Sequence, residues 1–245
     1  MTARFQAPAR SSADGWIVGV DGCPGGWIAV MRHRVTGDIT SSLLPDVAAL
    51  IALAKRAAVS AVDIPIGLTD AGPRRCDQLA RAMLSPHRAA SVFSAPLRPM
   101  LEAATRAEAG EIRRRIEGKS VSAQAWNICP RIREMDRLIT PRLQRRVVEV
   151  HPEVSFAAWS GEPMHDPKKT KSGRAVRAAL IDGMFGPAAR EAARRRHWVR
   201  DVGHDDLHDA FAALWTAERI WRGEAKRLPE SPEYDARGLR MEIVY

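Results

Sequence analysis

Several features that would place the chain in a specialised class are missing from the sequence. Its three cysteines (Cys23, Cys76 and Cys129) are far apart and include no CxxC pair, which argues against a disulfide framework or a structural zinc site and favours a reducing, cytoplasmic compartment. No apolar run approaches the roughly 18 residues that a membrane span needs, so no membrane partner is expected. Neither a GxxxxGK[ST] phosphate loop nor a GxGxxG fingerprint occurs. The stretch from Met1 to Asp14 has no apolar core, and we therefore expect residues 1–15 to be a disordered leader rather than a secretory signal.

Charge is unevenly balanced. The 245 residues include 38 Lys and Arg against 29 Asp and Glu, which gives a net charge of +9. Nearly all of the basic residues are arginine, whose forked guanidinium suits phosphate recognition. The excess favours a polyanionic partner, namely DNA or RNA, although an Arg- and Ala-rich composition also follows from a GC-rich coding sequence. A homodimer is left open.

Apolar runs and turn residues predict an α/β fold. The expected strands cover residues 16–21, 27–31, 38–44, 59–64 and 145–150, with an edge strand over 241–245, and the expected helices cover 46–58, 171–181 and 205–222. Residues 72–141 are rich in arginine and are predicted to be mainly helical. Three adjoining strands followed by strand–helix alternation indicate one α/β domain over residues 16–245, with a mixed sheet and a helical insertion over about 72–144.

Acidic residues occur where these elements end. Asp21 and Asp63 end the first and fourth strands, Glu149 lies in the fifth, and Asp206 and Asp209 lie on one face of the last long helix. Parallel strands bring such ends to one edge of a sheet, where converging carboxylates need a hard cation such as Mg²⁺ or Mn²⁺. Two such ions support phosphodiester hydrolysis. Taken singly, each acid also suits a turn or a helix cap.

Basic residues near these acids are candidate substrate contacts. Lys168 and Lys169 precede a helix and could hold a phosphate, or could belong to a solvated loop. Arg74, Arg75 and Arg81 follow the fourth strand and could clamp a phosphate backbone, or form a solvated helix face; His204 is a further candidate.

Six motifs occur in one order along the chain. They are Val18-Gly-Val-Asp-Gly-Cys-Pro-Gly-Gly-Trp27, Asp63-Ile-Pro-Ile-Gly-Leu68, Arg75-Cys-Asp77, Glu149-Val-His-Pro-Glu153, Lys168-Lys-Thr170 and Asp205-Asp-Leu-His-Asp-Ala210. From about Trp16 to Tyr245 the sequence resembles an uncharacterised-domain (DUF429-type) family of bacteria and archaea, described as predicted nucleases of the RNase H fold.

The resemblance implies an RNase H-like sheet of three antiparallel strands followed by parallel strands, with helices on both faces. It implies that Asp21 and Asp63 hold metal, and that Asp206 and Asp209 match the acidic helix start of Holliday-junction resolvases. Glu149 matches the family's own motif, while His204 would serve as a general base or bind phosphate. The implied reaction is Mg²⁺- or Mn²⁺-dependent cleavage of a nucleic acid.

Two alternatives share this fold core. One is a non-catalytic adaptor that binds nucleic acid or protein. The other is an ATP-binding protein of the actin-like and sugar-kinase type, because Asp21-Gly22 also suits the phosphate loop of those proteins; a second glycine-rich phosphate loop and an adenosine motif are missing here.

Overall fold

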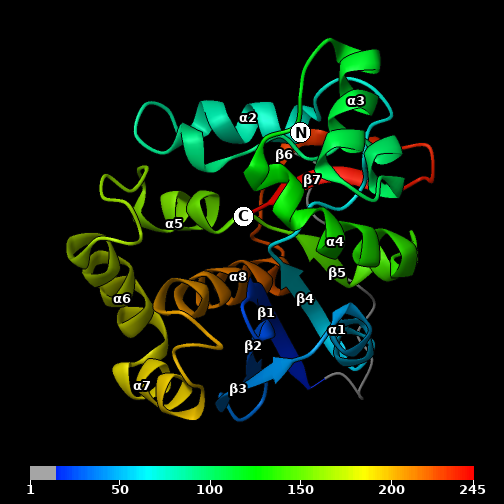
Figure 1. The fold of residues 1–245 in the computed structure, drawn as a ribbon. Coiled ribbons are helices and arrows are strands. Elements are labelled where there is room, and N and C mark those ends of the chain that lie inside the picture. Colours follow the sequence, from blue (N-terminus) through cyan, green and yellow to red (C-terminus); the bar gives the residue numbers. More distant parts are fainter. Residues whose placement is uncertain (1–14) are drawn as a thin grey trace.

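Five strands form the main sheet of the computed structural model, which describes residues 15–245 (Figure 1). The expected leader lies outside the described residues, apart from residue 15. The strand order is β3-β2-β1-β4-β5, and the strands are β1 (Trp16–Cys23), β2 (Gly26–His33), β3 (Ile39–Leu44), β4 (Ala57–Val62) and β5 (Val147–Glu149). The pairs β1–β2 and β2–β3 are antiparallel, whereas β1–β4 and β4–β5 are parallel. The predicted mixed sheet is confirmed.

Helices cover both faces of the sheet, as predicted. One hydrophobic core joins a sheet face to α8 (His204–Arg222) and to the helices α5 (Pro152–Ser160), α6 (Lys171–Phe185) and α7 (Pro187–Arg196). A second core joins the opposite face to α1 (Val47–Ala54) and α4 (Ala123–Leu138). Figure 1 shows α8 in the middle of the molecule beside β1, with α1 on the other side of β4. Residues alternate between these cores along each strand, as the two-residue period of a strand requires.

The contact between β1 and α8 depends on a glycine. A Cβ atom on Gly19 would lie 2.0 Å from the Leu214 backbone nitrogen and 2.3 Å from the Ala210 carbonyl oxygen. The backbone of the helix therefore lies directly on the backbone of the strand, which only a residue without a side chain permits. Asp21 follows two residues later on the same face of β1, so this contact also sets how close α8 comes to Asp21.

A long helical segment separates β4 from β5. It contains α2 (Arg75–Met83), η1 (Ala89–Ser91), η2 (Arg98–Glu102), α3 (Arg106–Glu117), α4 and η3 (Leu143–Arg145). The sequence fixes the start of α3, because Thr105 and Glu108 form a reciprocal capping box there. The helical stretch expected over residues 72–141 is therefore present.

The C-terminal tail differs from the expectation. Residues Arg240–Val244 form β7, which pairs with β6 (Arg227–Tyr234) in a separate two-stranded sheet and touches the main sheet through one parallel bridge between Val150 and Val244. The β6 sequence contains two prolines and three charged residues, so it lacks the apolar alternation by which strands are predicted. Helices α5 and α7 were also not predicted, and α1 ends at Ala54, before β4 begins at Ala57 and pairs in parallel with β1.

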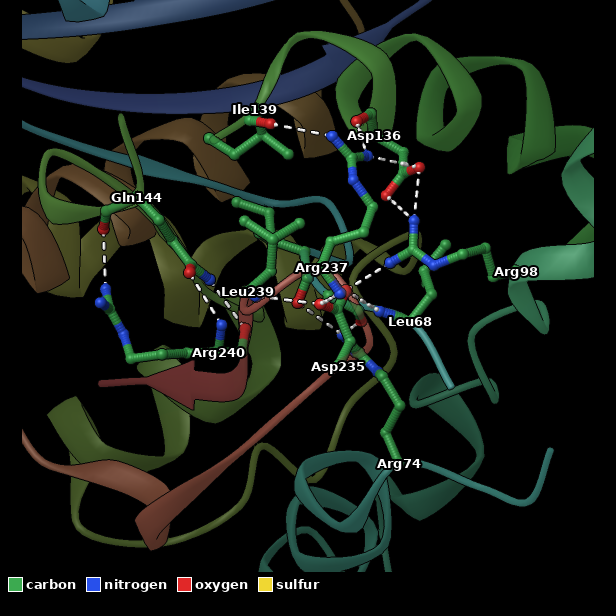
Figure 2. Close-up of polar contacts among 12 residues, drawn as sticks. Leu68, Arg74, Arg98, Asp136, Ile139, Gln144, Asp235, Arg237, Leu239 and Arg240 are labelled. Atoms are coloured by element: carbon green, nitrogen blue, oxygen red, sulfur yellow. Dashed lines mark hydrogen bonds and ion pairs between the residues drawn. The ribbon is translucent and has the colours of Figure 1, made fainter. Parts of the chain in front are cut away.

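Ion pairs fasten this hairpin to the helical segment (Figure 2). Arg98 forms a forked pair with both carboxylate oxygens of Asp136, each at 2.6 Å, and also pairs with Asp235. Asp235 accepts a hydrogen bond from the Leu68 backbone N–H at 3.1 Å, and Arg237 pairs with Asp136 at 2.9 Å. The loop after β4, the α4 helix and the hairpin are thus held together by one network. Within residues 15–245, no helix is long and apolar enough to cross a membrane.

Candidate functional site

Three of the predicted carboxylates meet at one edge of the sheet. Asp21 lies near the end of β1, and Asp63 directly follows β4, whose parallel pairing with β1 brings the two ends together. The Asp63 backbone N–H donates to the Val20 carbonyl at 3.0 Å, which fixes the turn after β4 against β1. Asp209 lies in the second turn of α8 and is fully buried. We call Asp21, Asp63 and Asp209 the carboxylate cluster.

The cluster is electrostatically unfavourable when fully ionised. Burial raises the pKa of Asp21 well above its usual range, and repulsion from Asp63 and Asp209 adds to the effect. Burial and the charge of Asp209 raise the pKa of Asp63 to about 7, although a hydrogen bond with Asp21 acts in the other direction. Burial raises the pKa of Asp209 to about 6. The site therefore favours protons or another cation among its carboxylates.

Lys168 is the ammonium that faces this cluster. Its Nζ donates to Oδ2 of Asp209, and the charges of Asp209, Asp21 and Asp63 raise the pKa of Lys168. The other carboxylate oxygen of Asp209, Oδ1, is buried without a hydrogen-bond partner. One lysine thus faces three carboxylates, and at least one acceptor atom is left unsatisfied.

Asp206 and His204 lie at the start of α8, next to the cluster. Asp206 accepts a hydrogen bond from the Gly203 backbone N–H at 2.9 Å and so caps the helix, while burial raises its pKa. Its charge is among the smaller influences on Asp21. His204, the first residue of α8, is exposed. The structure therefore gives Asp206 a helix-capping contact and leaves it at the periphery of the carboxylate cluster.

Glu149 has a different environment from the other predicted acids. Val148 packs in the core that contains α8, so strand alternation puts Glu149 on the other face of β5. There it forms a forked ion pair with Arg74, at 2.6 and 2.8 Å, and accepts from the Ile66 N–H at 2.6 Å. Burial raises the pKa of Glu149 to about 7 against the influence of Arg74.

The three arginines predicted to bind a phosphate backbone, Arg74, Arg75 and Arg81, lie in different environments. Arg74 is buried and also pairs with Asp77 at 2.6 Å, so its guanidinium is already matched by two carboxylates. Arg81 donates to the Val92 carbonyl at 2.8 Å and to the Ser94 hydroxyl at 3.0 Å, and thereby holds the loop after α2. Arg75 is exposed on α2. The structure does not bring these three side chains together as one clamp.

A cavity of about 360 Å³ opens beside the carboxylate cluster. Its lining includes Asp63, Asp209, Lys168 and Lys169. Three further lining residues were not identified as candidates from the sequence: Phe93, Gln124 and His151. Of these, only His151 carried a signal, because it is the centre of the Glu149-to-Glu153 motif. Phe93 and Gln124 come from the helical segment, and nothing in their local pattern distinguishes them from packing or surface residues.

Among residues 15–245, no three His, Cys, Asp or Glu side chains are arranged as a ready ligand set. The oxygen donors of the cluster nevertheless suit a hard divalent cation. Mg²⁺ commonly takes only one or two protein carboxylates and completes its shell with water and substrate phosphate.

Comparison with known proteins gives a family and no activity. A family model described as "Protein of unknown function (DUF429)" matches residues 19–234. No curated protein and no solved structure matches the chain. The matched residues include the carboxylate cluster, Lys168 and the lining of the cavity, apart from Ile243. Since the match covers most of its length, the chain belongs to the DUF429 family.

Proposed function

We propose that the protein is an RNase H-like, divalent-metal-dependent nuclease that hydrolyses phosphodiester bonds in nucleic acid. The observation that carries this proposal is the carboxylate cluster, in which the buried Asp21 and Asp209 and the partly accessible Asp63 share one ammonium and the Oδ1 atom of Asp209 has no partner. The strand arrangement and the positions of Asp21 and Asp63 at adjacent parallel strand ends support it.

The residues fit Mg²⁺ or Mn²⁺ in charge and in donor type. Asp63 and Asp209 line the cavity and would hold the cation, with Asp21 behind them and Asp206 at the periphery. A bound divalent cation supplies Lewis acidity, which polarises the phosphoryl group and acidifies water. A divalent cation fits the carboxylate cluster for two reasons. The cluster offers carboxylate oxygen donors, and the single ammonium of Lys168 leaves its negative charge incompletely balanced.

The chain's own residues would position the substrate. Lys168 and Lys169 line the cavity beside the acids and would bind phosphate oxygens. Asp21 is buried and hydrogen-bonded with Asp63, so it would orient Asp63 and take up a proton from it. Arg74 and Glu149 neutralise one another beneath the cavity and would keep its wall rigid.

Calorimetric titration with Mn²⁺ and Mg²⁺ tests the proposal. We expect saturable binding by the wild-type protein and metal-dependent cleavage of single-stranded or duplex oligonucleotides. Asp21→Asn should lose cleavage while its circular dichroism spectrum stays unchanged. Asp70→Asn, at an exposed position in the loop after β4, is the matched control and should cleave like wild type.

Undiminished cleavage by a folded Asp21→Asn protein would remove Asp21 from the site. If the wild-type protein bound nucleic acid but neither bound metal nor cleaved, the adaptor alternative would replace the nuclease. Stabilisation by ATP in place of nucleic-acid binding would favour the actin-like alternative.

A further inference from the structure

Two chemically different sets of side chains line the cavity beside the carboxylate cluster. Lys168 and Lys169, with Asp63 and Asp209, form a charged set. Val92, Phe93 and Ile128 form an apolar set. A ligand that contacts both sets combines a phosphate-like anion with an apolar, flat or compact group.

The same cavity is also lined by polar residues that have buried atoms without hydrogen-bond partners. His151 lines the cavity, and its Nδ1 is buried with no hydrogen-bond partner, while Nε2 has only a 3.4 Å contact with the Ser91 carbonyl. Arg88 also lines the cavity; its Nε has no hydrogen bond and lies 3.4 Å from a Glu153 carboxylate oxygen. Leaving such buried polar atoms unsatisfied is costly, so they point to a ligand with hydrogen-bonding edges.

A nucleobase has this combination of properties. Its faces are apolar and stack on an aromatic ring such as that of Phe93, and its edges carry donors and acceptors. Gln124, which lines the cavity from the first turn of α4, adds an amide that can both donate and accept. Burial lowers the pKa of His151, so a neutral ring with one acceptor nitrogen is present at neutral pH.

We propose that this cavity receives one unpaired nucleobase, so that the substrate is single-stranded nucleic acid or an unpaired strand end. This inference rests on the proposed nuclease function and names its substrate class. A base that is stacked and paired in a duplex cannot enter a pocket unless it is first turned out of the helix, which costs a few kcal/mol. With the base at Phe93, the attached phosphate would contact Lys168 and Lys169, which line the same cavity together with Asp63 and Asp209.

Binding in metal-free buffer tests the inference without any need for catalysis. The affinity of a 5′-fluorescein-labelled 12-nucleotide single strand would be measured by fluorescence anisotropy in EDTA and compared with that of the blunt duplex of the same sequence. We expect the single strand to bind at least tenfold more tightly than the duplex.

Two substitutions report on the cavity. Gln124→Glu puts a carboxylate where the polynucleotide enters, and Phe93→Leu keeps an apolar side chain but removes the stacking face. Each should weaken binding of the single strand at least fivefold. Gln78→Glu is the matched control, because Gln78 is likewise exposed on a helix but is not among the residues that line the cavity; it should bind like wild type.

The outcomes separate this inference from the nuclease proposal. Equal affinity for single strand and duplex, or equal effects of Gln124→Glu and Gln78→Glu, would overturn the cavity assignment even if the protein cleaves nucleic acid. Binding of free nucleoside monophosphates with no binding of the 12-nucleotide strand would overturn the polymer substrate. Cavity-dependent binding of the single strand, with no cleavage in Mn²⁺, would support the cavity and refute the nuclease.

Discussion

Replacement of Asp63 by asparagine should make the protein more stable at neutral pH, although the residue belongs to the proposed active site. Burial and the charge of Asp209 raise the pKa of Asp63 from its usual 3.8 to about 7. The folded protein therefore binds more protons than the unfolded chain between these values, and stability is lost as the pH rises through this window. An uncharged asparagine avoids that loss and retains an amide that can hydrogen-bond to Asp21.

The size of the effect follows from the pKa. A rise of about 3 pKa units corresponds to about 4 kcal/mol at 1.36 kcal/mol per unit. Asp63 is partly accessible to solvent, which screens the repulsion. We therefore expect a gain of roughly 1–2 kcal/mol at pH 8 and almost none at pH 4, where the wild-type carboxyl is already protonated in the folded protein.

Urea unfolding in EDTA at pH 4 and pH 8 measures this difference. Asp70→Asn, at an exposed position, is the control and should change stability little at either pH. A destabilised Asp63→Asn protein at pH 8, or the same gain at both pH values, would refute the view that Asp63 is held at an electrostatic cost.

Three further predictions concern other charges in the structure. Lys168→Met should raise the affinity for Mn²⁺ about tenfold in calorimetry, because the ammonium no longer competes for Asp209; weaker binding would contradict this. Glu149→Gln should lower the free energy of unfolding by about 3 kcal/mol in urea titrations, because it leaves the buried Arg74 poorly matched, and a loss below about 1 kcal/mol would contradict a structural ion pair. The affinity for single-stranded nucleic acid should fall steeply with salt, with a log–log slope of about −0.7 for each phosphate neutralised; a flat response would exclude the Arg-rich segment from backbone binding.

The sheet could be predicted from sequence because its strands are apolar runs that are followed by turn-forming residues. Pro24-Gly25 follows the end of β1, Pro65 lies shortly after β4, and the apolar stripe of α8 is long. The β6–β7 hairpin could not be predicted in the same way. It is held by long-range ion pairs to Arg98 and Asp136, and its first strand carries prolines and charges that resemble a loop.

The sequence indicates which site residues lie close together only where the sheet topology decides it. Asp21 and Asp63 meet because parallel strand ends must meet. Glu149 lines the same cavity as Asp63, but its place in the alternation of β5 pairs its carboxylate with Arg74. That outcome depends on which residue of β5 faces α8, and a three-residue strand has too short a pattern to reveal it. The cavity is lined by eight separate stretches of chain, so no local pattern could indicate it.

The backbone contact at Gly19 has a consequence for how the site can change during evolution. Core side chains of many sizes can be exchanged, and helices usually shift by fractions of an ångström to accommodate them. Here the separation of α8 from β1 is limited by main-chain atoms, which have the same size whatever the sequence. Substitutions of the surrounding core side chains should therefore leave the distance between Asp21 and Asp209 unchanged. A single methyl group at position 19 would push α8 away from β1 and so increase the distance between Asp21 and Asp209. Substitution of this glycine should therefore impair the activity of the site even in family members whose core side chains differ widely.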